Sequence, residues 1–99
     1  MEFALLSPDE LAAELGRRVR AERLRLDWTQ QTLAKRAGVS RWTVTRMESG
    51  EPVSLPNFLA VVTAMHRSAD LDQLLRPAPL RTIEQFVTPT NPARKRGRR

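Results

Sequence analysis

Residues 29–50, TQQTLAKRAGVSRWTVTRMESG, decide the fold of this chain. They contain two segments with apolar residues at helical spacing, 30–37 and 41–49, which are separated only by the tripeptide 38–40. Gly38 ends the first segment, because glycine enters the left-handed backbone region without steric cost. The sequence therefore predicts two short helices joined by a turn that holds one helix across the other.

The predicted crossing needs a small residue where the two helices approach each other, and Ala34 lies there. The apolar residues placed to bury the joint are Leu33, Ala37, Val39, Val44 and Met47. An alanine four residues before the turn glycine, with apolar residues at these offsets, is typical of a helix-turn-helix. A three-helix packing of another kind can share such a short turn, so the pattern alone leaves that alternative open.

Each predicted helix begins after a serine or threonine that can accept a hydrogen bond from a free backbone N–H. An apolar residue precedes each cap and another follows at the fourth helical position, which is the hydrophobic-staple pattern. The four arrangements are Leu6 and Leu11 around Ser7, Trp28 and Leu33 around Thr29, Val39 and Val44 around Ser40, and Val53 and Phe58 around Ser54. These signals predict helices over residues 8–26, 30–37, 41–49 and 55–66, followed by a short helix over 70–75.

The predicted fold is all-α, with a five-helix domain over residues 1–76 and a flexible proline- and arginine-rich tail over 77–99. Prolines interrupt any long element in the tail, at Pro77, Pro79, Pro89 and Pro92. Outside the central helix pair, the residues expected to face the core are Leu11, Leu15, Val19 and Leu26 in the first helix and Leu55, Phe58, Leu59, Val62 and Met65 in the fourth.

Positive charge is concentrated in two places, although the net charge is only +6. The tail carries the basic residues Arg94, Lys95, Arg96, Arg98 and Arg99, and residues 28–50 carry four basic residues against the single acid Glu48. This distribution suits a polyanionic partner. Two roles of the tail remain open: non-specific attraction to DNA phosphates, or an arm that enters a minor groove or binds an acidic protein surface.

The composition disfavours several classes of protein. The chain has no cysteine, so it has neither a disulfide framework nor a thiolate metal site. No apolar run in the sequence approaches the length needed to span a bilayer. Because no nucleophile–base pair or glycine-rich phosphate loop is visible, we expect a protein that is not an enzyme and binds no cofactor or metal. We also expect it to stay in the cytoplasm, associated with the nucleoid.

Residues 15–50 resemble the Xre/lambda-repressor-like family of DNA-binding domains, and the resemblance extends over about residues 8–75. It implies five helices, a third helix inserted into the major groove of a double-stranded operator, and a two-fold dimer on DNA. It also implies roles for individual residues. The base-reading positions are Ser40, Arg41, Trp42, Thr45 and Arg46, and the phosphate-binding positions are Thr29, Gln30 and Ser49.

The implied base readers differ in what they can recognise. Arg41 and Arg46 suit bidentate pairing with guanine, which contributes about 1–3 kcal/mol of discrimination for each contact. Trp42 can pack on a thymine methyl group or on a sugar edge, or else against its own domain. Several family members have glutamine at the position of Arg41, so the resemblance implies a different preferred base here.

The resemblance also implies an architectural ion pair between Arg23 and Glu48. The pair would be partly buried and would hold the third helix against the first without reading a base. Asp27 stands where the family usually has glycine after the first helix. Aspartate tolerates the left-handed conformation better than most residues, so the fold is expected to survive this departure.

Two segments, LLSPDELAAELGRRVR (5–20) and DWTQQTLAKRAGVS (27–40), resemble the antitoxins of the HipA/HipB toxin–antitoxin type. This resemblance implies a homodimeric repressor of its own promoter, and a HipA-like serine/threonine kinase toxin that the dimer holds inactive. The dimer interface is expected at the fifth helix and residues 76–87. Two other functions remain open: a stand-alone phage-type or Xre-type repressor without a toxin partner, and a protein-interaction module that does not read DNA.

Overall fold

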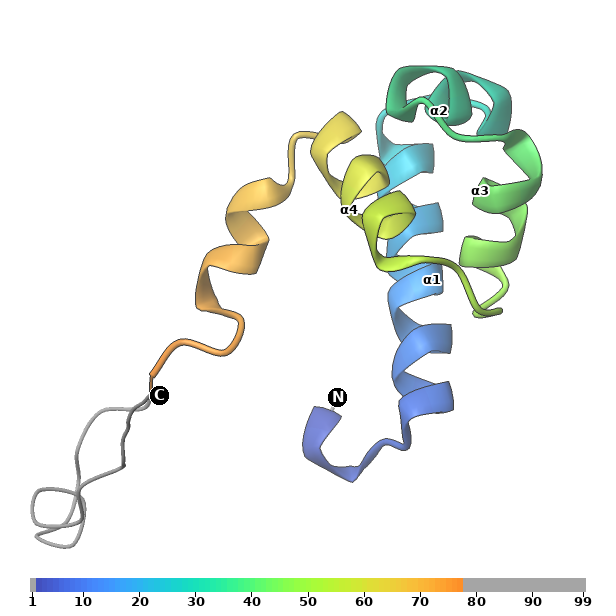
Figure 1. Ribbon diagram of the computed structural model, residues 1–99. Coiled ribbons are helices and arrows are strands. Elements are labelled where there is room, and N and C mark those ends of the chain that lie inside the picture. Colours follow the sequence, from blue (N-terminus) through green and yellow to red (C-terminus); the bar gives the residue numbers. More distant parts are fainter. Residues whose placement is uncertain (1, 78–99) are drawn as a thin grey trace, which may run out of the picture.

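The computed structural model describes residues 2–77, which form an all-helical domain without a strand among them. Its elements are, in chain order, the 3-10 helix η1 (Phe3–Leu5), the helices α1 (Pro8–Arg25), α2 (Gln30–Ala37), α3 (Arg41–Glu48) and α4 (Leu55–Ala64), and the 3-10 helix η2 (Ser68–Gln73). α2 packs against α3 and α4, and α3 also packs against the long α1 (Figure 1). None of the helices in this range combines the length and apolar character needed to cross a membrane. The all-α prediction is confirmed for the described residues, whereas the predicted tail lies almost entirely outside them.

Every α-helix begins at a serine or threonine whose side chain accepts a hydrogen bond from the backbone N–H three residues later. These caps are Ser7, Thr29, Ser40 and Ser54. At Ser7 the capping is reciprocal, because Glu10 Oε1 accepts from the Ser7 N–H at 2.8 Å and Ser7 Oγ accepts from the Glu10 N–H at 3.2 Å. The four predicted helix starts are therefore confirmed.

The four α-helices also end alike, with one residue in the left-handed region. These residues are Asp27, Gly38, Gly50 and His66, with φ angles of 64°, 71°, 79° and 59°. The next N–H then returns to the carbonyl five residues earlier, as from Trp28 to Arg23 at 3.1 Å and from Arg67 to Val62 at 3.0 Å. This is the Schellman arrangement, which satisfies the last carbonyl groups of each helix. The conformation expected of Asp27 is confirmed.

The structure corrects the ends of three predicted helices and the type of the fifth. α1 and α3 end one residue before the predicted ends at 26 and 49. α4 ends at Ala64 and does not reach residue 66, because His66 adopts the left-handed conformation. The segment predicted as a helix over 70–75 is instead the 3-10 helix Ser68–Gln73. Short connecting segments often take this tighter form, in which each hydrogen bond spans three residues.

The core lies where the four α-helices meet. Its buried residues are Val19, Leu33, Ala34, Val44, Met47, Val61 and Met65. The burial of Ala34 confirms the small residue expected at the crossing of α2 and α3. Leu33 and Val44, which follow the staple pattern, are fully buried on either side of the turn. The central helix pair is therefore packed as its sequence predicts.

The prediction for the inward face of α4 is wrong at two positions. Leu55 and Leu59 are exposed, whereas Val61, absent from the expected set, is fully buried. The stripe of α4 that packs inward consists of Phe58, Val61, Val62 and Met65. Its spacing is i, i+3, i+4, i+7, and it leaves Leu55 and Leu59 at the edge of the apolar face. Leu15 of α1 is likewise exposed and borders a groove.

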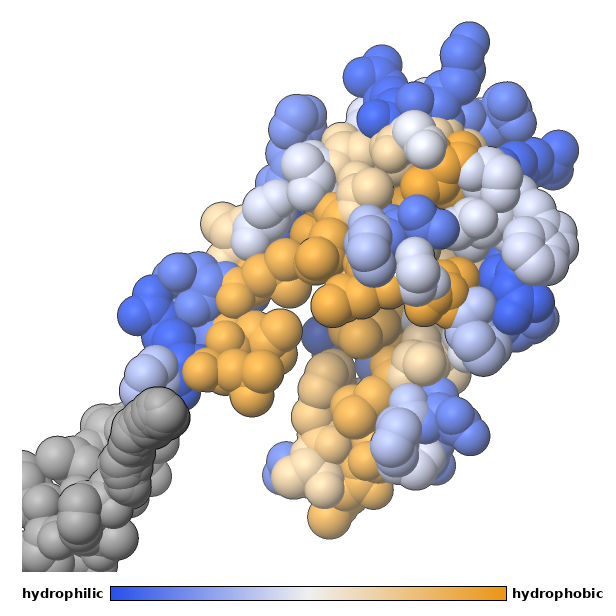
Figure 2. All heavy atoms as spheres, in the orientation of Figure 1, coloured by the Kyte–Doolittle hydropathy of each residue, from blue (hydrophilic) through white to orange (hydrophobic). Residues whose placement is uncertain are grey.

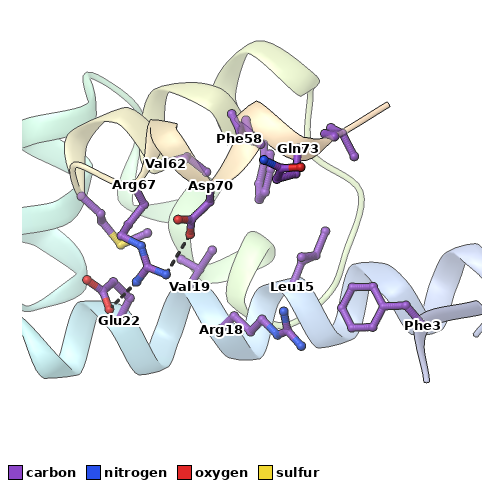
Figure 3. Close-up of a pocket in the computed structure, with 13 residues that line it drawn as sticks. Phe3, Leu15, Arg18, Val19, Glu22, Phe58, Val62, Arg67, Asp70 and Gln73 are labelled. Atoms are coloured by element: carbon purple, nitrogen blue, oxygen red, sulfur yellow. Dashed lines mark ion pairs between the residues drawn. The ribbon is translucent and has the colours of Figure 1, made fainter. Parts of the chain in front are cut away.

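An apolar groove of about 480 Å³ runs between η1, α1, α4 and η2 (Figure 3). Its apolar walls include Phe3, Leu15, Phe58, Val62, Leu71 and Leu74. At one end Arg18 covers Phe3, with its guanidinium carbon 4.6 Å from the centroid of the ring. Hydrophobic residues gather around this hollow in Figure 2, whereas hydrophilic residues cover α2 and the outer side of α3. The domain thus has an apolar side at the groove and a polar side at the central helix pair.

A charged cluster fastens η2 to α1 beside this groove. The buried Glu22 accepts hydrogen bonds from Arg25 at 2.7 and 3.0 Å and pairs with Arg67 at 3.0 Å. Arg67 also pairs with Asp70 of η2 at 2.8 Å (Figure 3). Arg67 therefore links a carboxylate of α1 to a carboxylate of η2, and this link fixes the position of η2 along the groove.

Glu22→Gln is expected to loosen η2 at neutral pH, and this effect is expected to vanish in acid. Hydrogen bonds from Arg25, with a smaller contribution from Arg67, lower the pKa of the Glu22 carboxyl from its ordinary value of 4.5. Because the pKa is lower in the folded state, the carboxylate stabilises the fold above pH 4.5, and this contribution is lost as the pH falls through the lowered pKa. The Tm difference between wild type and variant should therefore be largest near neutral pH.

The matched control for this prediction is Glu14→Gln. Glu14 also accepts from two arginines, Arg17 and Arg18, but both lie in α1 and neither pairs with a residue of η2 among the described contacts. Amide hydrogen exchange in η2 should therefore accelerate in Glu22→Gln and not in Glu14→Gln. Equal exchange in both variants would contradict the role given to Glu22.

Candidate nucleic-acid interface

The helix α3 buries one face and leaves the other open to solvent. The turn through Gly38, with a φ of 71°, brings α3 across the end of α2 (Figure 1). On the inner face of α3, Val44 and Met47 are buried in the core. The exposed residues on its outer side are Arg41, Trp42 and Thr45. A short, fully formed helix therefore presents three predicted base-reading residues outward.

Two predicted DNA contacts, Thr29 and Ser40, are the N-caps of α2 and α3. Thr29 Oγ1 accepts from the Thr32 N–H, and Ser40 Oγ accepts from the Thr43 N–H, each at 3.0 Å. Both capping residues are exposed. Their hydroxyl groups stand at helix N-termini, where free N–H groups and the helix dipole favour an anion such as phosphate.

Gln30, predicted to bind a phosphate, is partly buried and links α2 to α3. Its Nε2 donates to Glu48 Oε1 at 3.2 Å, and its Oε1 accepts from the Thr45 hydroxyl at 3.0 Å. The side chain therefore helps to fix the angle between the two helices. Its amide has a second N–H, which these contacts do not use.

Arg23 and Glu48 form an ion pair that fastens α3 to α1. Arg23 Nε and Nη2 donate to the two carboxylate oxygens of Glu48 at 2.7 and 3.0 Å, and Nη1 donates to the Trp28 carbonyl at 2.9 Å. The two side chains are only 9% and 4% exposed. The hydrogen bonds to Glu48 raise the pKa of Arg23 above its ordinary value, so the arginine stays charged. The pair is bidentate and buried, which is the geometry in which such a contact matters most.

The C-terminal end of α3 approaches α1 so closely that only glycine fits at position 16. A Cβ atom on Gly16 would lie 2.3 Å from the Met47 carbonyl oxygen and 3.0 Å from the Glu48 carbonyl oxygen. Gly16 is absent from the predicted site, although an isolated glycine inside a helical pattern is a signal of close packing. The position of α3 therefore depends on this contact as well as on the ion pair.

Arg46 is a predicted base reader whose side chain is engaged within the domain. Its guanidinium pairs with Glu51 at 2.8 Å and donates to the Pro52 carbonyl at 3.0 and 3.3 Å. It also covers the ring of Trp42, with its guanidinium carbon 4.6 Å from the ring centroid. Glu51 and Pro52 are absent from the predicted site, because they follow α3 in a loop where no periodic pattern applies.

The remaining predicted DNA contacts are not part of the N-terminal half of α3. Ser49 is exposed but caps the C-terminus of α3, at the opposite end of the helix from Ser40. Lys35 and Arg36 add positive charge in the last turn of α2. The basic residues predicted to contact DNA or a partner, Arg94, Lys95, Arg96, Arg98 and Arg99, lie outside the residues that the structure describes.

Residues 19–71, more than half of the chain, match the helix-turn-helix family. The matched region begins within α1, ends within η2 and includes the whole of α2, the turn and α3. No curated protein matches the chain. The match agrees with the geometry of the helix pair. One face of α3 packs against α1 and α2, and the opposite face is exposed to solvent. The chain therefore belongs to the Xre/lambda-repressor-like helix-turn-helix family of DNA-binding transcription regulators.

Proposed function

We propose that this protein is a sequence-specific repressor that inserts α3 into the major groove of its operator. The observation that carries the proposal is the outer face of α3, where Arg41, Trp42 and Thr45 are exposed while the inner face is locked to α1 and α2. The major groove of B-DNA admits an α-helix, and it displays the base edges that such side chains distinguish. In this proposal the protein acts in the cytoplasm, on the nucleoid, by binding alone and without catalysis.

Arg41→Ala is expected to weaken binding to each half-site of the preferred operator by about 5- to 150-fold, which corresponds to the loss of one bidentate contact to guanine. Arg41 is exposed at the first position of α3 and takes part in no ion pair within residues 2–77. The operator is first selected from random duplexes by the wild-type chain. Fluorescence anisotropy then compares the selected duplex with a scrambled one. The variant should lose preference at one guanine of each half-site.

Lys35→Ala is the control, because it removes one positive charge from α2 and leaves α3 unchanged. It is expected to weaken binding to the selected and scrambled duplexes by the same factor, as the loss of a phosphate contact does. If Arg41→Ala also weakens both duplexes equally, Arg41 does not read a base. If the wild-type chain enriches no duplex, the alternative of an interaction module that does not read DNA is preferred.

We propose that the repressor binds DNA as a homodimer, with η2 at the interface. Leu74 and Leu75, at the end of η2, are exposed, and a second subunit would remove them from water. A dimer of this kind reads two half-sites about 34 Å apart, or a multiple of that distance. Sedimentation with and without the selected operator tests this, since one chain per operator would reject it.

We also propose that the repressor is an antitoxin of the HipB type, which silences its own operon and neutralises a HipA-like serine/threonine kinase. The support is the likeness of residues 5–20 and 27–40 to such antitoxins. In this proposal a HipA-like kinase is encoded beside its gene, and co-expression with that kinase is expected to yield a stable complex with reduced kinase activity. Operator binding without such a complex would favour the stand-alone Xre-type or phage-type repressor.

A further inference from the structure

Trp42 is the largest apolar side chain on the outer face of α3. It is 68% exposed, although tryptophan carries one of the largest apolar surfaces of any residue and gains from burial. The guanidinium of Arg46, four residues later, covers its ring at 4.6 Å from the centroid. The two side chains therefore contact each other next to Arg41, with much of the indole surface facing solvent.

The guanidinium of Arg46 is held by the loop that follows α3. Nη1 donates to Glu51 Oε1 at 2.8 Å, and Nη2 and Nε donate to the Pro52 carbonyl at 3.0 and 3.3 Å. All three nitrogens of the guanidinium are therefore in use, and the side chain is only 26% exposed. One N–H on each Nη is left over, but the Nε–Nη2 edge already donates to the Pro52 carbonyl. To offer that edge to a guanine, Arg46 would have to leave this carbonyl.

The loop that carries these acceptors is itself fixed. The Glu51 N–H donates to the Arg46 carbonyl at 2.9 Å. Gly50 before it has a φ of 79°, and a Cβ atom there would lie 2.8 Å from the Cα atom of Ala13 in α1. The backbone just before the Pro52 carbonyl is therefore packed against α1.

We propose that Arg46 is a positioning residue, and that Trp42 reads the operator by packing its open surface on the C5-methyl group of a thymine. The inference rests on the proposed function, and it names thymine as one base that the protein recognises. The thymine methyl is the apolar group that B-DNA presents in its major groove. A tryptophan held at a set angle by a planar, hydrogen-bonded guanidinium offers a matching apolar surface, and Arg41 next to it supplies the donors for guanine.

The test uses the full chain and the operator that the wild type selects, with uracil replacing one thymine at a time. Uracil lacks only the methyl group, so its hydrogen-bonding edge is unchanged. At one thymine of each half-site the wild type is expected to lose about fourfold in affinity, the effect of one buried methyl group. Trp42→Ala and Arg46→Ala are both expected to bind the thymine and uracil duplexes equally at that position.

Two further variants separate positioning from charge and from folding. Arg46→Lys keeps the positive charge but loses the planar fork, and it is expected to lose the discrimination as Arg46→Ala does. Arg36→Ala is the matched control, since Arg36 covers Trp28 at 4.7 Å in the same way but lies in α2. This control is expected to keep the wild-type ratio of thymine to uracil affinity. Circular dichroism establishes that each variant keeps its helices.

The proposal is overturned if Arg46→Lys and Arg46→Ala keep the wild-type ratio of thymine to uracil affinity. It is also overturned if Arg46→Ala abolishes sensitivity to 7-deazaguanine, since Arg46 would then contact N7 of a guanine. An operator in which no thymine is sensitive to uracil overturns this inference and leaves the proposed function standing. A wild-type chain that selects no operator overturns both.

Discussion

Replacing Glu48 with alanine is expected to lower the free energy of unfolding by about 3–5 kcal/mol. Arg23 would keep its charge in a site where its side chain is only 9% exposed, with two of its nitrogens left without acceptors. Gln30 would lose an acceptor as well. Small domains have a total stability of only about 5–15 kcal/mol, so this variant is expected to be close to unfolding. Urea denaturation followed by circular dichroism measures the loss.

A double variant shows whether the loss comes from the stranded charge or from lost packing. Arg23→Met combined with Glu48→Leu replaces the pair with apolar side chains of similar size, and it is expected to be more stable than Glu48→Ala alone. Glu14→Ala, which breaks a pair on the surface of α1, is expected to cost far less. Wild-type stability in Glu48→Ala would mean that the buried pair does not form in solution.

Gly16→Ala is expected to lower the free energy of unfolding by about 1–3 kcal/mol and to reduce operator affinity as well. In an open helix the same change would stabilise the helix by about 1 kcal/mol. Here the added methyl group would lie 2.3 Å from the Met47 carbonyl oxygen, so α3 must move away from α1. A displaced α3 would carry Arg41 and Trp42 out of register with the bases. Thermal unfolding and operator binding are measured on the same preparation.

Arg20→Ala serves as the control for Gly16→Ala, because it places alanine on the exposed side of the same helix. It is expected to change stability by only a few tenths of a kcal/mol. A higher Tm for Gly16→Ala would mean that helix propensity dominates and that α3 does not press against α1. Unchanged operator affinity in a destabilised Gly16→Ala would separate the stability of the domain from the placement of α3.

The helix boundaries could be predicted because the interactions that set them are local. Ser40 needs only the Thr43 N–H to cap α3, and Gly38 needs only the chain around it to turn α2 into the loop. Such signals lie within five residues of each other, so they can be read directly from the order of residues. The predicted end of α4 is wrong because His66 takes the left-handed conformation that glycine usually provides, and the ends of α1 and α3 differ from the predicted ones by one residue.

The contacts between distant segments could be predicted only in part. Arg23 and Glu48 were placed by their resemblance to family positions, since nothing in the 24 residues between them indicates a contact. The pairs of Glu22 with Arg67 and of Arg46 with Glu51 carry no such signal. These pairs form because η2 and the loop after α3 pack against the rest of the domain. That packing is not indicated by the periodicity of the sequence. The same limit applies to Arg46, since its position in the sequence gives no sign of the acceptors at Glu51 and Pro52 that engage its side chain.

The helix ends have a consequence for the speed of DNA recognition. Since α3 is capped at both ends and tied to its neighbours, this helix is already folded before the encounter and does not have to form on the groove. The rate of capture is then set by diffusion and by the attraction of basic side chains to phosphates, which added salt screens. Differences in affinity among operators should accordingly appear in how long each complex lasts, with little difference in how quickly it forms.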